Sequence, residues 1–190
     1  MTENYDALMA LLESRHSCRS FAPDPVDEKA LQSLSDAFAL APQAGGGGRR
    51  GIQCRFVTDR AAIRNLAKRG QEAFIAFCQS IPSPFVREQT ARYGENFFWF
   101  GEAPALAVVS CRKVPVFLEK LAGDRAHRIW GGELSAAMAS FSLLLAAETI
   151  GLGACCLTGP LVMWHEVEGL LGISKRDTLI LLIALGYPQA

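Results

Sequence analysis

The chain has 190 residues, with 19 basic and 19 acidic side chains and a formal net charge of zero at pH 7. Half of the residues are hydrophobic and a fifth are charged, which excludes a disordered chain and is enough for one domain with a sizeable core. The balanced charge provides no field that would attract nucleic acid or an anionic membrane, so we expect neither as a partner. Arg far outnumbers Lys, which favours a ligand with phosphate or carboxylate groups because guanidinium offers a forked set of donors.

The cysteines have no CxxC spacing. Adjacent Cys155 and Cys156 would point to opposite faces of a strand. We therefore expect no metal site and no disulfide framework, and we interpret the cysteines as small buried side chains. No signal peptide is evident, so a reducing cytoplasmic location is expected.

The first half of the sequence predicts helices around one strand. The first helix ends near Glu13, and Asp27 is the expected N-cap of a second helix that ends near Leu40. A strand is predicted over residues 52–57, followed by helices over residues 60–77 and 85–93.

The second half predicts buried strands and a long apolar helix. Strands are expected over residues 104–111, 154–157 and 179–185, with short helices over residues 115–122 and 163–171. Residues 133–149 predict a helix that is apolar almost all round, with three serines interrupting its apolar run. We interpret this helix as a buried helix and not as a membrane span. It is expected to lie at the centre of the protein or to be buried by a second subunit. The alternation of elements indicates one α/β or α+β domain over residues 1–190.

Residues 14–21, with the sequence SRHSCRSF, are too polar for a core. Two guanidinium groups, an imidazole and three hydroxyls fit an anion such as phosphate, and an ordinary polar loop is the alternative. For His16, a structural histidine and a ligand contact remain equally open. The four glycines of residues 45–48 fit either a backbone cradle for a ligand or a surface loop.

An aromatic cluster with the sequence NFFWF occupies residues 96–100. It has no regular period, so it lines a pocket or covers a core or a subunit surface. We favour the covering role, because aromatic side chains dominate buried contacts.

Four segments share their order and spacing with one family: residues 14–21 followed by Pro25 and Val26, residues 41–44 (APQA), residues 143–148 leading into GLGAC at 151–155, and residues 184–188 (ALGYP). Together they resemble the FMN-dependent nitroreductase family over nearly the whole chain. The resemblance implies an α+β nitroreductase-like fold, with an antiparallel-rich central sheet surrounded by helices. It also implies a tight homodimer, with the helix of residues 133–149 as the long central dimer-interface helix.

The resemblance further implies an NAD(P)H oxidoreductase with ping-pong hydride transfer through flavin N5. The acceptor would be a small molecule such as a nitroaromatic or a quinone. No catalytic side chain is expected, because the flavin carries the chemistry.

The resemblance assigns cofactor-binding roles to residues of three segments. Arg15, His16 and Ser17 match the phosphate and ribityl contacts, and Arg19 matches the basic residue at the pyrimidine edge of the ring. The segment contributed across the dimer matches Pro42, Gln43 and Ala44, and the turn under the ring matches Leu157, Thr158 and Gly159.

Departures from the family pattern keep alternatives open. The usual Asn-containing segment after Ala-Pro is replaced by the glycine loop, Gln43 stands in place of a Ser, and Phe141 in place of a Gln. A basic residue that many relatives place after Gly-Tyr-Pro is absent, and Arg49 or Arg50 is the candidate substitute. A non-catalytic flavin-binding relative with the same dimeric fold therefore remains the second hypothesis. A structural protein that interacts through the Trp99 cluster is a third.

Overall fold

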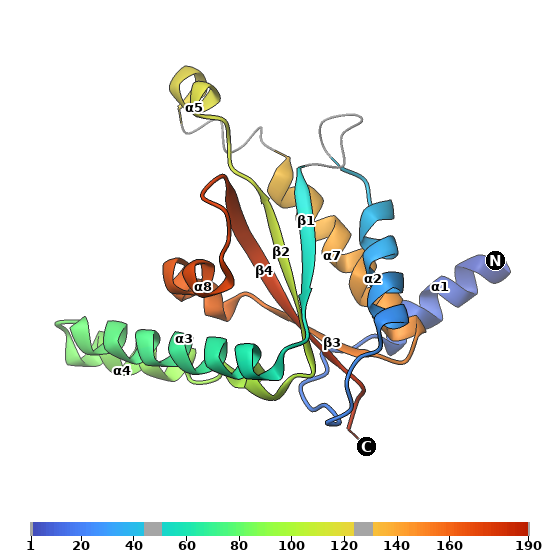
Figure 1. Cartoon of the computed structure of the whole chain (residues 1–190), viewed down its shortest axis with the longest axis horizontal. Coiled ribbons are helices and arrows are strands. Elements are labelled where there is room, and N and C mark those ends of the chain that lie inside the picture. Colours follow the sequence, from blue (N-terminus) through green and yellow to red (C-terminus); the bar gives the residue numbers. More distant parts are fainter. Residues whose placement is uncertain (1, 44–50, 124–130, 190) are drawn as a thin grey trace.

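The computed structural model describes residues 2–43, 51–123 and 131–189 (Figure 1). Its strands are β1 (Ile52–Val57), β2 (Ala105–Arg112), β3 (Gly153–Leu157) and β4 (Asp177–Gly186). Its α-helices are α1 (Glu3–Ser14), α2 (Glu28–Leu40), α3 (Arg60–Ser80), α4 (Pro84–Gly94), α5 (Val116–Ala122), α7 (Gly132–Thr149) and α8 (Trp164–Leu171). Single 3₁₀ turns span Trp99–Glu102 and Gly159–Met163. These elements confirm the predicted α+β order.

The four strands form one antiparallel sheet in the order β1-β2-β4-β3. The two central strands, β2 and β4, are almost wholly buried, which is why both read as continuous apolar runs. At the outer edge of β3, Ser17 forms a parallel bridge with Ala154, and the Cys18 N–H donates to the Ala154 carbonyl at 3.1 Å. The segment after α1 is thereby fixed along β3.

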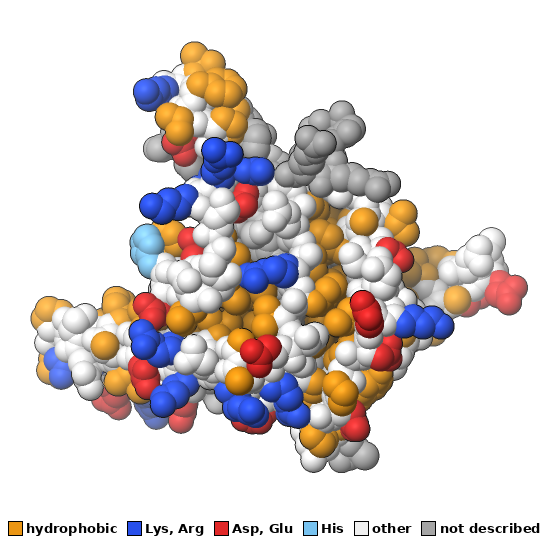
Figure 2. Space-filling view, in the orientation of Figure 1, with side chains coloured by type: hydrophobic (Ala, Val, Ile, Leu, Met, Phe, Trp, Pro, Cys, Tyr) orange, Lys and Arg blue, Asp and Glu red, His pale blue; other side chains and the backbone are white. Residues whose placement is uncertain are grey.

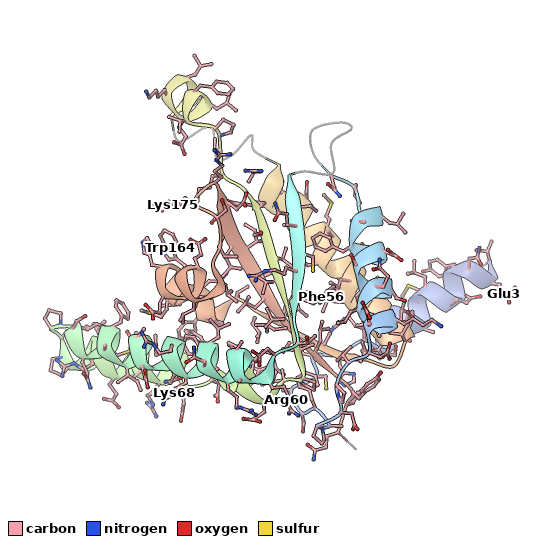
Figure 3. The ribbon with its side chains drawn as sticks, in the orientation of Figure 1. Glu3, Phe56, Arg60, Lys68, Trp164 and Lys175 are labelled. Carbon is pink, nitrogen blue, oxygen red and sulfur yellow. The ribbon has the colours of Figure 1, made fainter. Side chains whose placement is uncertain are left out.

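Helices cover both faces of the sheet (Figure 1). One core, here called the α2/α7 core, joins these two helices to the sheet around Leu34, Phe38 and Leu143. Phe56 of β1 packs against it and lies toward α2 in Figure 3. The other core, here called the α3/α8 core, lies on the opposite face around Phe74, Phe98 and Phe100.

Local capping explains where the helices begin. The Asp27 carboxylate accepts a hydrogen bond from the Ala30 N–H at 2.8 Å, which confirms it as the N-cap of α2. The same carboxylate accepts from the Tyr187 hydroxyl at 2.9 Å, so the start of α2 is tied to the segment after β4. Arg60, at the start of α3 (Figure 3), donates to the Pro23 carbonyl at 3.0 Å and holds the nearby loop.

The six cysteines are all free thiols, and Cys155 and Cys156 lie on opposite faces of β3 as predicted, one buried and one exposed. Burial raises the pKa of the Cys54 thiol to about 12 and that of Cys111 to about 11, so both stay protonated at neutral pH. Among the helices of the described residues, none combines the length and apolar character that a membrane crossing requires.

Candidate functional site

A cavity of about 510 Å³ opens between the end of β3 and the end of α4. Its volume lies in the range of about 300–1,000 Å³ that is usual for small-molecule sites. Its walls are formed by Arg19, Tyr93, Asn96, Phe97, Trp99 and residues 155–160. Four residues expected to bind the cofactor, Arg19, Leu157, Thr158 and Gly159, therefore meet at one cavity.

The segment of residues 15–19 is extended where it runs along β3, so its side chains alternate between two sides. Cys18 is buried and packs against Gly153, where a Cβ would overlap the Cys18 side chain. Ser17 and Arg19 lie on the other side, exposed. Backbone pairing with Ala154 thus turns two polar side chains of the segment toward the cavity end of β3.

The charges of Arg15 and Arg19 reach two successive thiols of β3. Burial raises the pKa of the Cys155 thiol, while the charge of Arg19 and a hydrogen bond with Ser17 oppose the rise. Burial and the neighbouring Cys155 raise the pKa of Cys156, and the charge of Arg15 opposes it. The bridge between Ser17 and Ala154 holds the segment along this strand, and the charges of both guanidinium groups favour the thiolate forms of its two cysteines.

Neither Arg15 nor Arg19 forms an ion pair with an acidic group of the described residues. No acidic side chain is among the residues that line the cavity. Arg19 lines the cavity and Arg15 does not, and guanidinium groups without a carboxylate among the described residues are donors suited to an anion.

The turn after β3 offers backbone donors at the cavity wall. The N–H groups of Thr158 and Gly159 have no acceptor among the residues that the structure describes. The chain then enters the 3₁₀ turn Gly159–Met163, in which the Leu161 N–H donates to the Thr158 carbonyl at 3.0 Å. The turn therefore presents two free donors and one small residue to a ligand.

His16 is satisfied locally. Its Nδ1–H donates to the Ser14 carbonyl at 3.1 Å, which leaves Nε2 as the ring atom available to a ligand. His16 is exposed and does not line the cavity. The structural interpretation of this histidine is thus supported by a contact, and a ligand contact through Nε2 stays a prediction.

Pro42 and Gln43, from the second segment expected to bind the cofactor, lie away from the cavity. Pro42 and Gln43 follow the end of α2, whereas Asp27 at its start is the end tied to Tyr187. A helix of this length spans about 20 Å, so α2 carries both residues away from the segment of residues 15–19 (Figure 1). Neither residue lines the cavity. Ala44, the glycine loop, Arg49 and Arg50 lie outside the described residues.

The aromatic cluster divides between two roles. Phe98 and Phe100 are buried in the α3/α8 core, as the favoured interpretation required. Phe97 and Trp99 are half-buried, pack against the same core and also line the cavity. Tyr93 and Asn96, which were not predicted as site residues, line it as well. The cluster was the signal for Asn96, Phe97 and Trp99, but its irregular spacing does not reveal which side chains turn inward. Tyr93 lies outside the cluster, at the end of the predicted helix of residues 85–93.

A metal centre receives no support from side-chain chemistry. Within the described ranges, no three His, Cys, Asp or Glu side chains are grouped so that they could hold an ion. The cavity is suited to bind an anionic ligand. Arg19 and the N–H groups of Thr158 and Gly159 offer hydrogen-bond donors, and the rings of Phe97 and Trp99 form another part of the lining.

The nitroreductase family model matches residues 12–187. The chain belongs to the nitroreductase family. This match includes the segment of residues 15–19, both cavity walls and the whole sheet. It therefore confirms the resemblance that the four sequence segments indicated.

Solved structures of several flavin-containing proteins share the fold. A nitroreductase with bound FMN from Bacteroides fragilis is 20% identical, with a TM-score of 0.72 over 100% of this chain and 90% of that one. A BluB-like flavoprotein from Clostridium difficile is 22% identical, with a TM-score of 0.76 over 96% of this chain and 90% of that one. Iodotyrosine deiodinase with bound FMN and 3-iodo-L-tyrosine is 22% identical, with a TM-score of 0.71 and the same coverages. At these identities the likeness establishes the fold.

Proposed function

We propose that the protein is an FMN-dependent oxidoreductase that takes reducing equivalents from NAD(P)H and passes them to a small-molecule acceptor. The proposal is carried by Arg15 and Arg19, whose guanidinium groups have no carboxylate partner among the described residues. Arg19 lines a cavity that has no carboxylate in its lining. Membership of the nitroreductase family supports FMN as the anion that this site accepts.

The residues present fit FMN. Arg15 and Ser17 would hold the phosphate through a charge-assisted and a neutral hydrogen bond, with His16 beside the ribityl chain. Arg19 would face the pyrimidine edge, where a cation stabilises negative charge on the reduced ring and raises its potential. The free N–H groups of Thr158 and Gly159 would orient the ring, with Leu157 beside them. When bound, FMN supplies hydride uptake and release at N5.

We also infer a homodimer. The outward side of α7 carries Leu134, Met138 and Phe141, which are 67%, 45% and 47% exposed. Their i, i+4, i+7 spacing makes one apolar stripe along the helix, and a second copy is the partner that we infer for it. Because Pro42 and Gln43 lie far from the cavity of their own chain, they would reach the cavity of the partner subunit, with Ala44 in the same segment.

An anaerobic titration of the purified protein tests the function. We expect a yellow protein whose oxidised-flavin absorption is bleached by NADH or NADPH and restored by nitroaromatic or quinone acceptors. A protein that binds FMN but is reduced by neither nucleotide would favour the non-catalytic relative. A colourless protein that takes up no added FMN would contradict both hypotheses.

The phosphate assignment has its own test in Arg15→Ala. Loss of one charged hydrogen bond costs roughly 1.5–3 kcal/mol, so the Kd for FMN should rise by about one to two decades. The measurement is fluorescence titration of the apoprotein with FMN. Arg176→Ala is the matched control, because this exposed residue lies in the turn before β4 and does not line the cavity. Equal affinities in the two variants would remove Arg15 from the phosphate site.

A further inference from the structure

A second, smaller cavity lies on the α3/α8 face of the sheet, apart from the candidate flavin site. Its volume is about 150 Å³, and it lies between β1, the first turns of α3 and the end of α8. Its lining, which includes Arg55, Leu66 and Leu170, shares no residue with that of the first cavity. We call it the Arg55 pocket, because Arg55 is the one ionisable side chain in this lining.

The floor of the Arg55 pocket is apolar and belongs to the α3/α8 core. Ile63 and Leu106 are fully buried and Leu66 is 4% exposed, whereas Leu170 at the end of α8 is 38% exposed. Figure 2 shows hydrophobic side chains that reach the surface between α3 and the sheet. An apolar group that entered the pocket would lose its own contact with water and cover this surface, which favours its binding.

The guanidinium group of Arg55 is held at one side of the pocket with donors to spare. Its Nη2 donates to the Leu171 carbonyl at 2.6 Å, which fixes the group at the end of α8. Its other two nitrogens, Nε and Nη1, have no acceptor among the residues that the structure describes. A guanidinium group with free donors and a fixed position is suited to a carboxylate.

Arg55 also has no ion-pair partner. Within the described ranges, no carboxylate lies within salt-bridge distance of it. Asp177 lines a neighbouring cavity together with Arg55, but its Oδ1 lies 3.4 Å from Nε of Arg112 and is paired there. The positive charge at the Arg55 pocket is therefore left for a ligand.

The size and the lining of the pocket restrict the class of ligand. A volume of about 150 Å³ is below the range of about 300–1,000 Å³ that is usual for drug-sized molecules, so the ligand is small. An ion without a hydrocarbon part would leave the floor uncovered, and a neutral hydrocarbon would leave Arg55 without a partner. One cation beside an apolar floor fits a molecule with one negative charge and one apolar tail.

We propose that the Arg55 pocket binds a small aliphatic monocarboxylate, with its carboxylate on Arg55 and its hydrocarbon tail against Leu66 and Leu106. This site lies apart from the candidate flavin site, so the proposal goes beyond the proposed function and does not depend on it.

A ligand-observed NMR titration of the purified protein, with excess FMN to compete for the first cavity, tests the proposal. The probes are hexanoate, acetate, which has the charge without the tail, 1-hexanol, which has the tail without the charge, and hexylamine, which has the opposite charge. We expect hexanoate to bind most tightly. From acetate through butanoate to hexanoate, the Kd should fall about fourfold for each CH₂ group that is buried.

Two substitutions locate the binding at this pocket. Arg55→Gln should raise the Kd for hexanoate about ten- to hundredfold, the range for one charged hydrogen bond, and Arg55→Lys should retain most of the affinity. Ala62→Leu keeps Arg55 and adds bulk at an exposed position of the lining, so it should also weaken hexanoate.

Arg87→Gln is the matched control, because Arg87 of α4 likewise donates to a backbone carbonyl, that of Ile81 at 2.9 Å, but does not line the pocket. Equal Kd values for hexanoate in Arg55→Gln and Arg87→Gln would overturn the proposal. Equal binding of hexanoate and 1-hexanol would remove the role of the charge, and equal binding of hexanoate and acetate that of the apolar floor, and either result would overturn it as well. Full hexanoate affinity in Ala62→Leu would contradict the placement of the ligand in this pocket.

Discussion

The two faces of the sheet are packed by different kinds of side chain. On the α2/α7 face, Ala136, Ala139 and Ala147 bring α7 close to the strands, and the outward side of that helix remains apolar. On the α3/α8 face, phenylalanine rings fill the space between helix and sheet, and the outward side of α3 is charged, as Figure 2 shows along this helix. The first face is suited to a further protein surface, and the second to the edge of a cavity.

Truncating one core residue on each face should produce the largest effects and separate their roles. Phe100 and Leu143 are both fully buried, one in each core. Phe100→Ala should cost about 3–5 kcal/mol and Leu143→Ala about 2–5 kcal/mol in chemical denaturation. Only Phe100→Ala should also weaken FMN binding, because Phe100 belongs to the core against which the cavity residues Phe97 and Trp99 pack.

If both variants unfold at a similar denaturant concentration and both retain the FMN affinity of the wild type, the two faces do not differ in the way described. A denaturation slope equal to that of the wild type is the control for an unchanged unfolding transition.

The sequence was sufficient for features that depend on local pattern. The apolar run of β2, the Asp27 cap and the long apolar helix of residues 133–149 are set by neighbouring residues, and each was found near its predicted bounds. The cavity wall could not be predicted in the same way. The contacts of Phe97 with Gly159 and of Phe98 with Gly70 join residues distant in the sequence, and nothing in the local spacing indicates them.

The same distinction between local patterns and long-range contacts explains where the expected site residues lie. Arg19 and Thr158 meet because the segment of residues 15–19 pairs with β3, which is a long-range event that only the family resemblance anticipated. Pro42 and Gln43 lie at the far end of α2, so their proposed role depends on a second chain that no pattern within one sequence describes.

A charge on the outward side of α7 should break the proposed dimer and leave the fold intact. In Met138→Glu, association would require burial of an unpaired carboxylate, which is strongly unfavourable. We expect at least a tenfold rise in the dimer dissociation constant by analytical ultracentrifugation, with unchanged helix content by circular dichroism. FMN affinity should fall with it, since the partner's segment would be lost.

Val86→Glu provides the control for this change, because Val86 is as exposed as Met138 but lies on α4 (47% and 45%). Loss of association in both variants would mean that added charge, rather than the α7 stripe, weakens the dimer. A Met138→Glu protein that sediments as the wild type does would contradict the assignment of this face.

The smallest effect is expected at Asp27, where the α2/α7 face is tied to the end of β4. Its pKa is lowered, first by the hydrogen bond from the Ala30 N–H and then by that from the Tyr187 hydroxyl. Because the folded pKa lies below the ordinary value of 3.8, the carboxylate's contribution to stability is fully present above about that pH. It is lost as the pH falls through the folded pKa.

Asp27→Asn should retain the helix cap, since Asn is also a favoured N-cap, but should not titrate. We therefore expect the melting temperature of the wild type to be modestly higher than that of Asp27→Asn at pH 7, and this difference to shrink in acid. Asp27→Ala should melt at a lower temperature than either protein, both at pH 7 and in acid. Tyr187→Phe removes one of the two donors and should reduce the acid-sensitive part of the difference without affecting the cap. The outcome that would contradict this is a difference in melting temperature between the wild type and Asp27→Asn that stays the same from pH 7 down to acid. It would mean that the charge of the Asp27 carboxylate does not contribute to the stability of the link between α2 and Tyr187.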